Sequence, residues 1–247
     1  MQISSSLATE DGGISLYHSN LSLIRGKVDG QIISINKPSE GRLRSRKVVS
    51  RSRARPTGKF PSSKMKRMIQ WESPHELNAY RLLDADPEVL SFYEQPLVIN
   101  YILDGVQHRH YPDILVETQT SKELWEVKTR DEALKPKNIL RTKLMCNELP
   151  NHGYQYRVAL AEDLARNPRL TNALLLLRLG RNNVSFIDKE RISNFFSIIE
   201  HITWKLITSG KLGVNGKNHI CRLIMDGYLF FDIDKELTKA TIYKNNK

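Results

Sequence analysis

The feature that most constrains this chain is a pair of short charged motifs on two consecutive predicted strands. Tyr111-Pro-Asp113 leads into the first strand, and Glu126-Val-Lys128 ends the second, with the glutamate 13 positions after the aspartate. Residues two apart in a strand point to the same side of a sheet, so Glu126 and Lys128 share one face. Val127 points to the opposite, apolar face. With Asp113 at the start of the neighbouring strand, the two carboxylates are expected to meet.

Two carboxylates that meet on one side of a sheet predict a site for a hard cation. Oxygen ligands suit Mg²⁺, with Mn²⁺ as a substitute. Such an ion activates water and offsets charge that develops on a phosphate, which are the two needs of phosphodiester hydrolysis. Lys128 beside the ion is expected to stabilise the nucleophile and the transition-state charge. The alternative is that Asp113, Glu126 and Lys128 are ordinary surface charges on an α/β domain.

A third carboxylate, Glu76, has two competing explanations. Ser73-Pro-His-Glu76 has the residues of a capping box, with an N-cap serine, a proline at the first helical position and a glutamate two positions further on. The predicted helix over residues 73–83 immediately precedes the strands of Asp113 and Glu126, so Glu76 is also expected as the remaining metal ligand. Capping and ligation exclude one another. Glu123 has the wrong parity to face Lys128.

Turn and strand signals arrange these motifs into one α/β domain. Strands over 97–103 and 106–111 are joined by the turn Asp104-Gly105, and strands over 113–117 and 124–128 follow a further turn at 119–121. Pro136 opens an amphipathic helix to about residue 149, and residues 154–160 alternate as a last strand. The order predicts a restriction-endonuclease-like core with a mixed central sheet flanked by helices over residues 61–165.

Basic residues dominate the region before this core. Residues 1–60 show no sustained period apart from a short strand at 31–35, and we interpret them as an arm. The net charge of +11 and the pI near 9.6 favour a polyanionic partner, double-stranded DNA above all. A solvated, disordered tail is the alternative. The residues expected to contact DNA are Arg42, Arg44, Arg46, Lys47, Arg51, Arg53, Arg55, Lys64, Lys66 and Arg67.

Helical patterns return after Pro168, over residues 170–179, 190–208 and 215–225. Two apparent strands follow, at 227–234 and 238–244. Three helices and a β-ribbon predict a winged-helix-like domain over residues 166–247, in which one helix can enter a DNA major groove. A small helical domain that docks another protein fits the same pattern.

The remaining candidates for metal or DNA contact are weaker. His108 and His110 form a His-x-His pair, but no third zinc ligand follows, so the pair is expected at the hairpin surface. The helix after the motif carries Lys135, Lys137, Arg141 and Lys143, which are expected to face either solvent or DNA. Cys146 and Cys221 lie far apart and are expected as buried thiols. No run approaches the roughly 18 apolar residues of a membrane helix, and no secretory signal is visible, so a cytoplasmic protein is expected.

The motifs together resemble the TnsA family, the endonuclease subunits of heteromeric bacterial cut-and-paste transposases, which have a PD-(D/E)xK nuclease fold. The resemblance is densest from about residue 51 to residue 130. It is carried by the runs Ser62–Ile69, Glu72–Glu76, Leu83–Pro87 and Phe92–Pro96 and by the two charged motifs. By position, Glu76, Asp113 and Lys128 match the family's catalytic residues. Glu126 occupies the family's variable acid-or-glutamine position before the lysine.

The resemblance implies a division of labour on DNA. A TnsA-like subunit cleaves the 5′ ends of a transposon, a DDE transposase cuts and joins the 3′ ends, and a AAA+ ATPase regulator licenses the pair. It further implies a bacterial, nucleoid-associated protein, with the basic tail after Leu237 as a docking segment for the regulator. Two other functions fit the same residues. A free-standing restriction or repair nuclease would cut DNA alone, and a non-catalytic DNA-binding adaptor would need neither Asp113 nor a metal.

Overall fold

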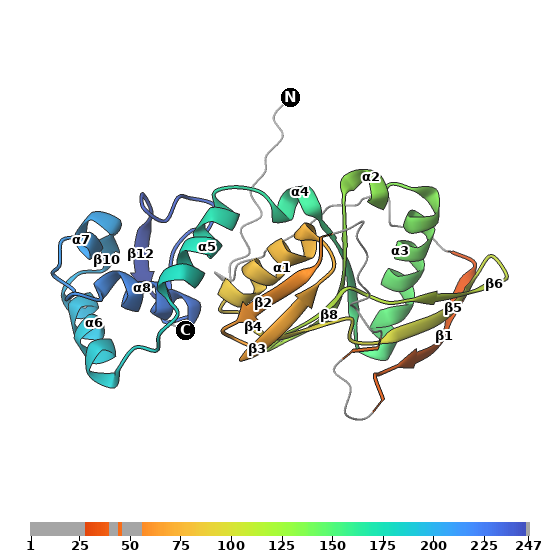
Figure 1. Ribbon diagram of the computed structural model, residues 1–247, viewed down its shortest axis with the longest axis horizontal. Coiled ribbons are helices and arrows are strands. Elements are labelled where there is room, and N and C mark those ends of the chain that lie inside the picture. The colour runs from red at the N-terminus through yellow and green to blue at the C-terminus, as the bar shows by residue number, and fades with distance from the viewer. Residues whose placement is uncertain (1–27, 40–43, 46–55, 246–247) are drawn as a thin grey trace.

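A four-stranded mixed sheet lies at the centre of the computed structural model, which describes residues 28–39, 44–45 and 56–245 (Figure 1). Its strands are β4 (Val89–Glu94), β7 (Ile114–Thr118), β8 (Lys122–Lys128) and β9 (Gln155–Leu160), in that order. All neighbours are antiparallel except β8 and β9, which run parallel. A parallel pair needs a long crossover, which α2 (Arg130–Ala133), α3 (Pro136–Glu148) and a 3₁₀ turn at Leu149–His152 provide. The predicted mixed sheet is confirmed.

A second, antiparallel sheet lies beside the first. It contains β1 (Gly30–Asn36), β5 (Val98–Leu103) and β6 (Val106–His110) in the order β1-β5-β6. Asp104 and Gly105 make the two-residue turn between β5 and β6 with φ of 51° and 74°, which is why an Asp-Gly pair suits this hairpin. Helix α3 covers the inner faces of both sheets, because Leu144 and Met145 are buried with Ile99 and Leu124 in one hydrophobic cluster.

Helix α1 (Pro74–Ala85) covers the opposite face of the central sheet, where Tyr80 and Leu83 pack with Trp125. Beside it lies a hairpin of β2 (Gly58–Ser62) and β3 (Arg67–Trp71), which the sequence analysis did not predict. Asp84 of α1 holds the hairpin by accepting hydrogen bonds from the backbone N–H groups of Ser63 and Lys64, both at 3.0 Å. Strand β2 therefore begins within the region that was expected to be an arm.

The C-terminal part of the chain is mainly helical. It contains α4 (Ala161–Leu164), α5 (Arg169–Leu179), α6 (Phe186–Ile198), α7 (Trp204–Thr208) and α8 (Gly216–Met225), with a small antiparallel sheet of β10 (His201–Thr203), β12 (Thr241–Lys244) and β11 (Leu229–Phe230). The hydrophobic core around α1 continues into α5, α6 and α8, across the predicted boundary at residue 165. Among the described helices, none has the length and apolar character that crossing a membrane requires.

One predicted helix in this part is wrong. Residues 190–208 were expected to be a single helix, whereas α6 ends at Ile198 and the chain then forms β10 before α7 begins. The residues after Ile198 include β-branched Ile199, Ile202 and Thr203, which favour extended backbone. Pairing with β12 stabilises that conformation, and this long-range contact is not visible in the local pattern.

Candidate active site

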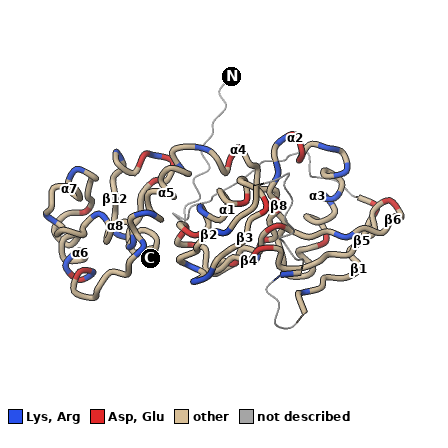
Figure 2. The backbone as a smooth tube through the Cα atoms, viewed as in Figure 1, with Lys and Arg blue, Asp and Glu red and all other residues tan. Residues whose placement is uncertain are grey.

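An open cleft of about 580 Å³ lies where the first turn of α1, the start of β7, the end of β8 and the start of α2 meet. Its walls carry Glu76, Asp113 and Lys128, three of the four residues predicted to be catalytic. The fourth, Glu126, adjoins the cleft because its Oε1 atom lies 2.8 Å from Lys128 Nζ. Figure 2 shows several acidic residues close to α1 and β8 in a chain that is basic as a whole. The cleft is therefore a concentration of carboxylates on a positively charged protein.

Asp113 is fixed to both neighbouring strands by its backbone and its side chain. Its N–H donates to Trp125 O at 2.9 Å, and its carbonyl oxygen accepts from the N–H of Gln95 at 2.8 Å. Its Oδ2 atom accepts from the N–H of Val127 at 2.7 Å. Burial raises the pKa of the Asp113 carboxyl well above its usual value, and the nearby carboxylates of Glu126 and Glu76 raise it further. The three acids are therefore close enough to repel one another.

Glu126 is buried, with 5% of its surface exposed. Its Oε1 atom accepts from Lys128 Nζ at 2.8 Å and from Arg141 Nη2 at 3.1 Å. Burial raises the pKa of Glu126, but His110, Lys128 and Arg141 outweigh burial and hold that pKa below its usual value. Burial also lowers the pKa of His110 to about 4, so this imidazole is neutral near pH 7. The lasting positive charges beside Glu126 are those of Lys128 and Arg141.

Glu76 caps α1 and faces the cleft at the same time. Ser73 Oγ accepts from the N–H of Glu76 at 3.2 Å and donates to Glu76 Oε1 at 3.1 Å. The other carboxylate oxygen, Oε2, accepts from the N–H of Glu72 at 2.9 Å. The capping interpretation thus accounts for both carboxylate oxygens of Glu76. The backbone N–H that donates to the carboxylate is that of Glu72, whereas a capping box would use that of Ser73. For Glu76 to bind a metal, its carboxylate must leave this cap.

The fit of this site to a hard cation rests on its chemistry. Within the described ranges, no three His, Cys, Asp or Glu side chains are grouped as a ready-made metal site. The donors at hand are carboxylate oxygens, which is the set that Mg²⁺ prefers. Glu126 Oε2 is buried without a hydrogen-bond partner, and a buried charged oxygen without a partner is costly. A cation between Asp113 and Glu126 would relieve both this cost and their mutual repulsion.

Two residues near Glu126 lie where the sequence analysis did not expect them. His110 was expected at the hairpin surface, but it is 4% exposed and its Nε2 lies 3.0 Å from the Tyr156 hydroxyl. Arg141 was expected to face solvent or DNA, but it points inward to Glu126. Its spacing in the helix could have indicated this position. Asn138, three positions before Arg141, and Met145, four positions after it, lie on the buried face of α3.

The predicted DNA contacts fall into two groups. Arg42, Arg46, Lys47, Arg51, Arg53 and Arg55 lie outside the described residues. Of the others, Arg67 makes a two-pronged ion pair with Glu94 at 2.9 and 2.6 Å, Arg44 also pairs with Glu94, and Lys64 donates to the Asp86 carbonyl at 2.8 Å. Lys66 is exposed at the turn between β2 and β3. Three of these four described residues therefore have partners within the fold.

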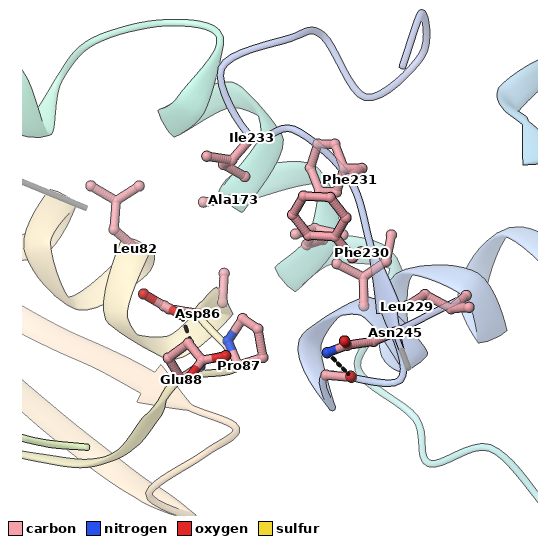
Figure 3. A pocket seen from close by; sticks show the side chains of 14 residues that line it. Leu82, Asp86, Pro87, Glu88, Ala173, Leu229, Phe230, Phe231, Ile233 and Asn245 are labelled. Atoms are coloured by element: carbon pink, nitrogen blue, oxygen red, sulfur yellow. Dashed lines mark hydrogen bonds between the residues drawn. The ribbon is translucent and has the colours of Figure 1, made fainter. Parts of the chain in front are cut away.

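A second, smaller pocket lies between α1 and the C-terminal helices (Figure 3). Leu82, Ala173, Phe231 and Ile233 give it apolar walls, and Asp86 stands at its edge on the α1 side. None of the four predicted catalytic residues lines it. It is part of the packing between α1 and the C-terminal helices and does not belong to the candidate active site.

Comparison with family models matches residues 86–160 to the TnsA-like endonuclease N-terminal family. Comparison with curated proteins gave no match. The matched segment runs from the end of α1 to the end of β9, so it contains Asp113, Glu126 and Lys128 and stops short of Glu76. A TnsA-like endonuclease domain indicates a nuclease role in transposition. The match confirms the predicted resemblance: the chain carries a TnsA-like endonuclease domain over residues 86–160, which supports its membership of the TnsA family.

Proposed function

We propose that this protein is a magnesium-dependent DNA endonuclease that cleaves the 5′ ends of a transposon. In this proposal it acts with a DDE transposase subunit and a AAA+ ATPase regulator. The observation that carries the proposal is the meeting of Glu76, Asp113 and Lys128 in one cleft, with Glu126 in contact with Lys128. The TnsA-like segment contains three of these four residues, which supports the reaction class.

The carboxylates of Glu76, Asp113 and Glu126 would hold Mg²⁺, with Mn²⁺ as a substitute. When bound, the ion supplies positive charge for the scissile phosphate and lowers the pKa of attacking water. Asp113 is held for this role by the N–H of Val127, whereas Glu76 must leave its cap. Lys128 has 22% of its side chain exposed, so its ammonium group can turn from Glu126 to a phosphate oxygen and stabilise the negative charge that develops there.

The described ends of the basic segment support a DNA contact at this cleft. The N–H of Ser45 donates to Gln95 O at 3.0 Å, and Gln95 is hydrogen-bonded to Asp113. Pro56 lines the cleft itself. The chain between Ser45 and Pro56 therefore begins and ends beside the candidate active site. We propose that its basic residues, Arg46, Lys47, Arg51, Arg53 and Arg55, neutralise DNA phosphates, with Arg42 and Lys66 as further contacts.

Strand cleavage of labelled transposon-end DNA with Mg²⁺ tests this function. Wild type and Asp113→Ala are each assayed alone and with the cognate transposase and ATPase. We expect 5′-end cutting that needs the partners and is lost in the variant. Cutting by the wild type alone would favour a free-standing nuclease. DNA binding without cutting under any condition would favour an adaptor.

A further inference from the structure

Arg141 stands behind the candidate active site, on the side of β8 that α3 covers. Its Nη2 lies 3.1 Å from Glu126 Oε1, and its side chain is 19% exposed. Burial raises the pKa of the hydroxyl groups of Tyr101 on β5 and Tyr156 on β9, and the positive charge of the same guanidinium opposes that rise in both. Arg141 is therefore held by Glu126 on β8, lies near tyrosines of β5 and β9, and does not line the cleft.

The two oxygens of Glu126 have different surroundings. Oε1 accepts from both Arg141 and Lys128, whereas Oε2 has no hydrogen bond and lies 3.5 Å from His110 Nε2. His110 is in turn 3.0 Å from the hydroxyl of Tyr156. The carboxylate thus lies in a frame of Arg141, His110 and Tyr156, and Lys128 approaches it from the cleft.

The chemistry of the two cations divides their roles. A guanidinium is planar and permanently charged, and its donors have a fixed geometry, so Arg141 can hold a carboxylate oxygen in one orientation. A lysine ammonium is a point charge on a flexible stem. If Lys128 turns to the substrate, Glu126 still needs a counter-charge, because a buried carboxylate without one is strongly destabilised. Arg141 supplies that charge from a fixed position.

On the basis of the nuclease function proposed above, we infer that Arg141 is a positioning residue for Glu126. It holds the carboxylate in one orientation, so that Lys128 is free to exchange between Glu126 and a phosphate. The affinity of the site for a divalent cation then depends on a residue that touches neither metal nor DNA. Partners of this kind behind a ligand change metal affinity by roughly tenfold to 100-fold.

The chain offers a matched control on the same strand. Glu123 faces away from Glu126, and its Oε2 pairs with Arg157 Nε at 3.1 Å. The Arg157 guanidinium also lies 5.4 Å from the ring centre of Trp125. The Arg157–Glu123 pair is part-buried to a similar degree, with side-chain exposures of 23% and 14%. Arg157→Gln therefore removes a similar ion pair from the opposite face of the sheet.

Calorimetric titration of the full chain with Mn²⁺ tests the inference without relying on activity. We expect Arg141→Gln to weaken Mn²⁺ binding by roughly tenfold or more, and Arg157→Gln to leave it unchanged. The Mn²⁺ affinity of Arg141→Lys should lie between those of the wild type and Arg141→Gln, because lysine keeps the positive charge but lacks the planar guanidinium group. Equal effects of Arg141→Gln and Arg157→Gln, or wild-type binding by Arg141→Gln, would overturn the positioning role.

Two further variants separate the possible failures. Asp113→Asn should lose Mn²⁺ binding; if it binds like the wild type, the proposed nuclease site fails and the role of Arg141 fails with it. If Asp113→Asn loses binding and Arg141→Gln does not, only the role of Arg141 is wrong. Should Arg141→Gln not fold, Tyr156→Phe removes one hydroxyl of the frame and keeps the ring. It should weaken binding in the same direction, and unchanged binding would contradict the inference.

Discussion

Asp113 and Val127 are joined by a hydrogen bond of 2.7 Å, from the backbone N–H of Val127 to the Oδ2 atom of Asp113. This bond ties the carboxylate of Asp113 to the backbone of Val127, the residue between Glu126 and Lys128. A shift of one residue in the pairing of β7 and β8 would turn Glu126 and Lys128 to the apolar face. The register that builds the hydrophobic core thus also builds the candidate site.

Asp113→Asn is expected to abolish cleavage and to stabilise the metal-free protein by about 1 kcal/mol. The amide can still accept from Val127, but it removes a buried charge that Glu126 and Glu76 repel. Thermal unfolding in a chelating buffer measures the stability, and strand cleavage measures the activity. Glu123→Gln, on the other face of β8, is the control and should cleave normally. A lower melting temperature for Asp113→Asn would contradict this account of the repulsion.

Glu76→Gln separates the two explanations of this residue. Glutamine serves a helix cap as well as glutamate does, so the free energy of unfolding should change by less than about 0.5 kcal/mol. It lacks the charge of a metal ligand, so cleavage and Mn²⁺ binding should be lost. Denaturant unfolding and cleavage are measured on the same preparation. Wild-type cleavage by Glu76→Gln would show that Glu76 only caps α1.

The buried acid Asp86 predicts a pH dependence of stability. Burial raises its pKa from the ordinary 3.8 to about 7, although the N–H of Glu88 and the charge of Lys64 oppose burial. Since the pKa is higher in the folded state, the contribution of Asp86 is complete below about pH 4 and is lost as the pH rises through about 7. The free energy of unfolding should therefore fall between about pH 4 and 7.

Asp86→Asn checks this assignment. The variant keeps an acceptor for the N–H of Glu88 and has no proton to lose, so it should show a smaller fall over the same pH range. Denaturant unfolding at several pH values measures both proteins. Parallel pH profiles for the wild type and Asp86→Asn would contradict the assignment to this residue.

Glu94→Gln is expected to destabilise the fold by about 3 kcal/mol. Glu94 is 1% exposed and neutralises both Arg44 and Arg67, so the variant leaves two arginines without a counter-charge. Denaturant unfolding measures the loss. Glu117→Gln is the matched control, because Glu117 pairs with exposed Lys122 and its loss should cost less than about 1 kcal/mol. Equal losses for the two variants would contradict the structural role of Glu94.

The helices and turns that were predicted correctly are those whose ends are marked by nearby residues in the sequence. Asp104-Gly105 fixes a hairpin, Ser73 and Pro74 fix the start of α1, and Pro136 fixes the start of α3. The unpredicted strands depend on distant partners. Strand β3 is held through the contacts of Arg67 and Gln70 with Glu94, and β4 is held by pairing with β7. A local pattern does not contain such contacts.

The candidate site was predictable to a similar extent. Strand parity chose Glu126 over Glu123, and the structure pairs Glu126 with Lys128 on one face and Glu123 with Arg157 on the other. The residues behind Glu126 were missed, because Arg141 meets Glu126 only after α3 folds over the sheet, and Tyr156 meets His110 only once β9 has joined the sheet. Likewise, Arg67 resembled a phosphate contact in a basic run, and its partner Glu94 lies 27 positions away in the chain.

Anomalous diffraction from crystals of the full chain soaked in Mn²⁺ tests the central claim most directly, since it locates the cation itself. The account predicts a peak with oxygens of Asp113 and Glu126 about 2.0 to 2.3 Å away, and Glu76 turned out of its cap toward the ion. Asp113→Asn crystals should lack that peak. The account would be contradicted by a fully occupied manganese site elsewhere and no peak between Asp113 and Glu126. In that case Glu76 would still accept the hydrogen bond from the N–H of Glu72.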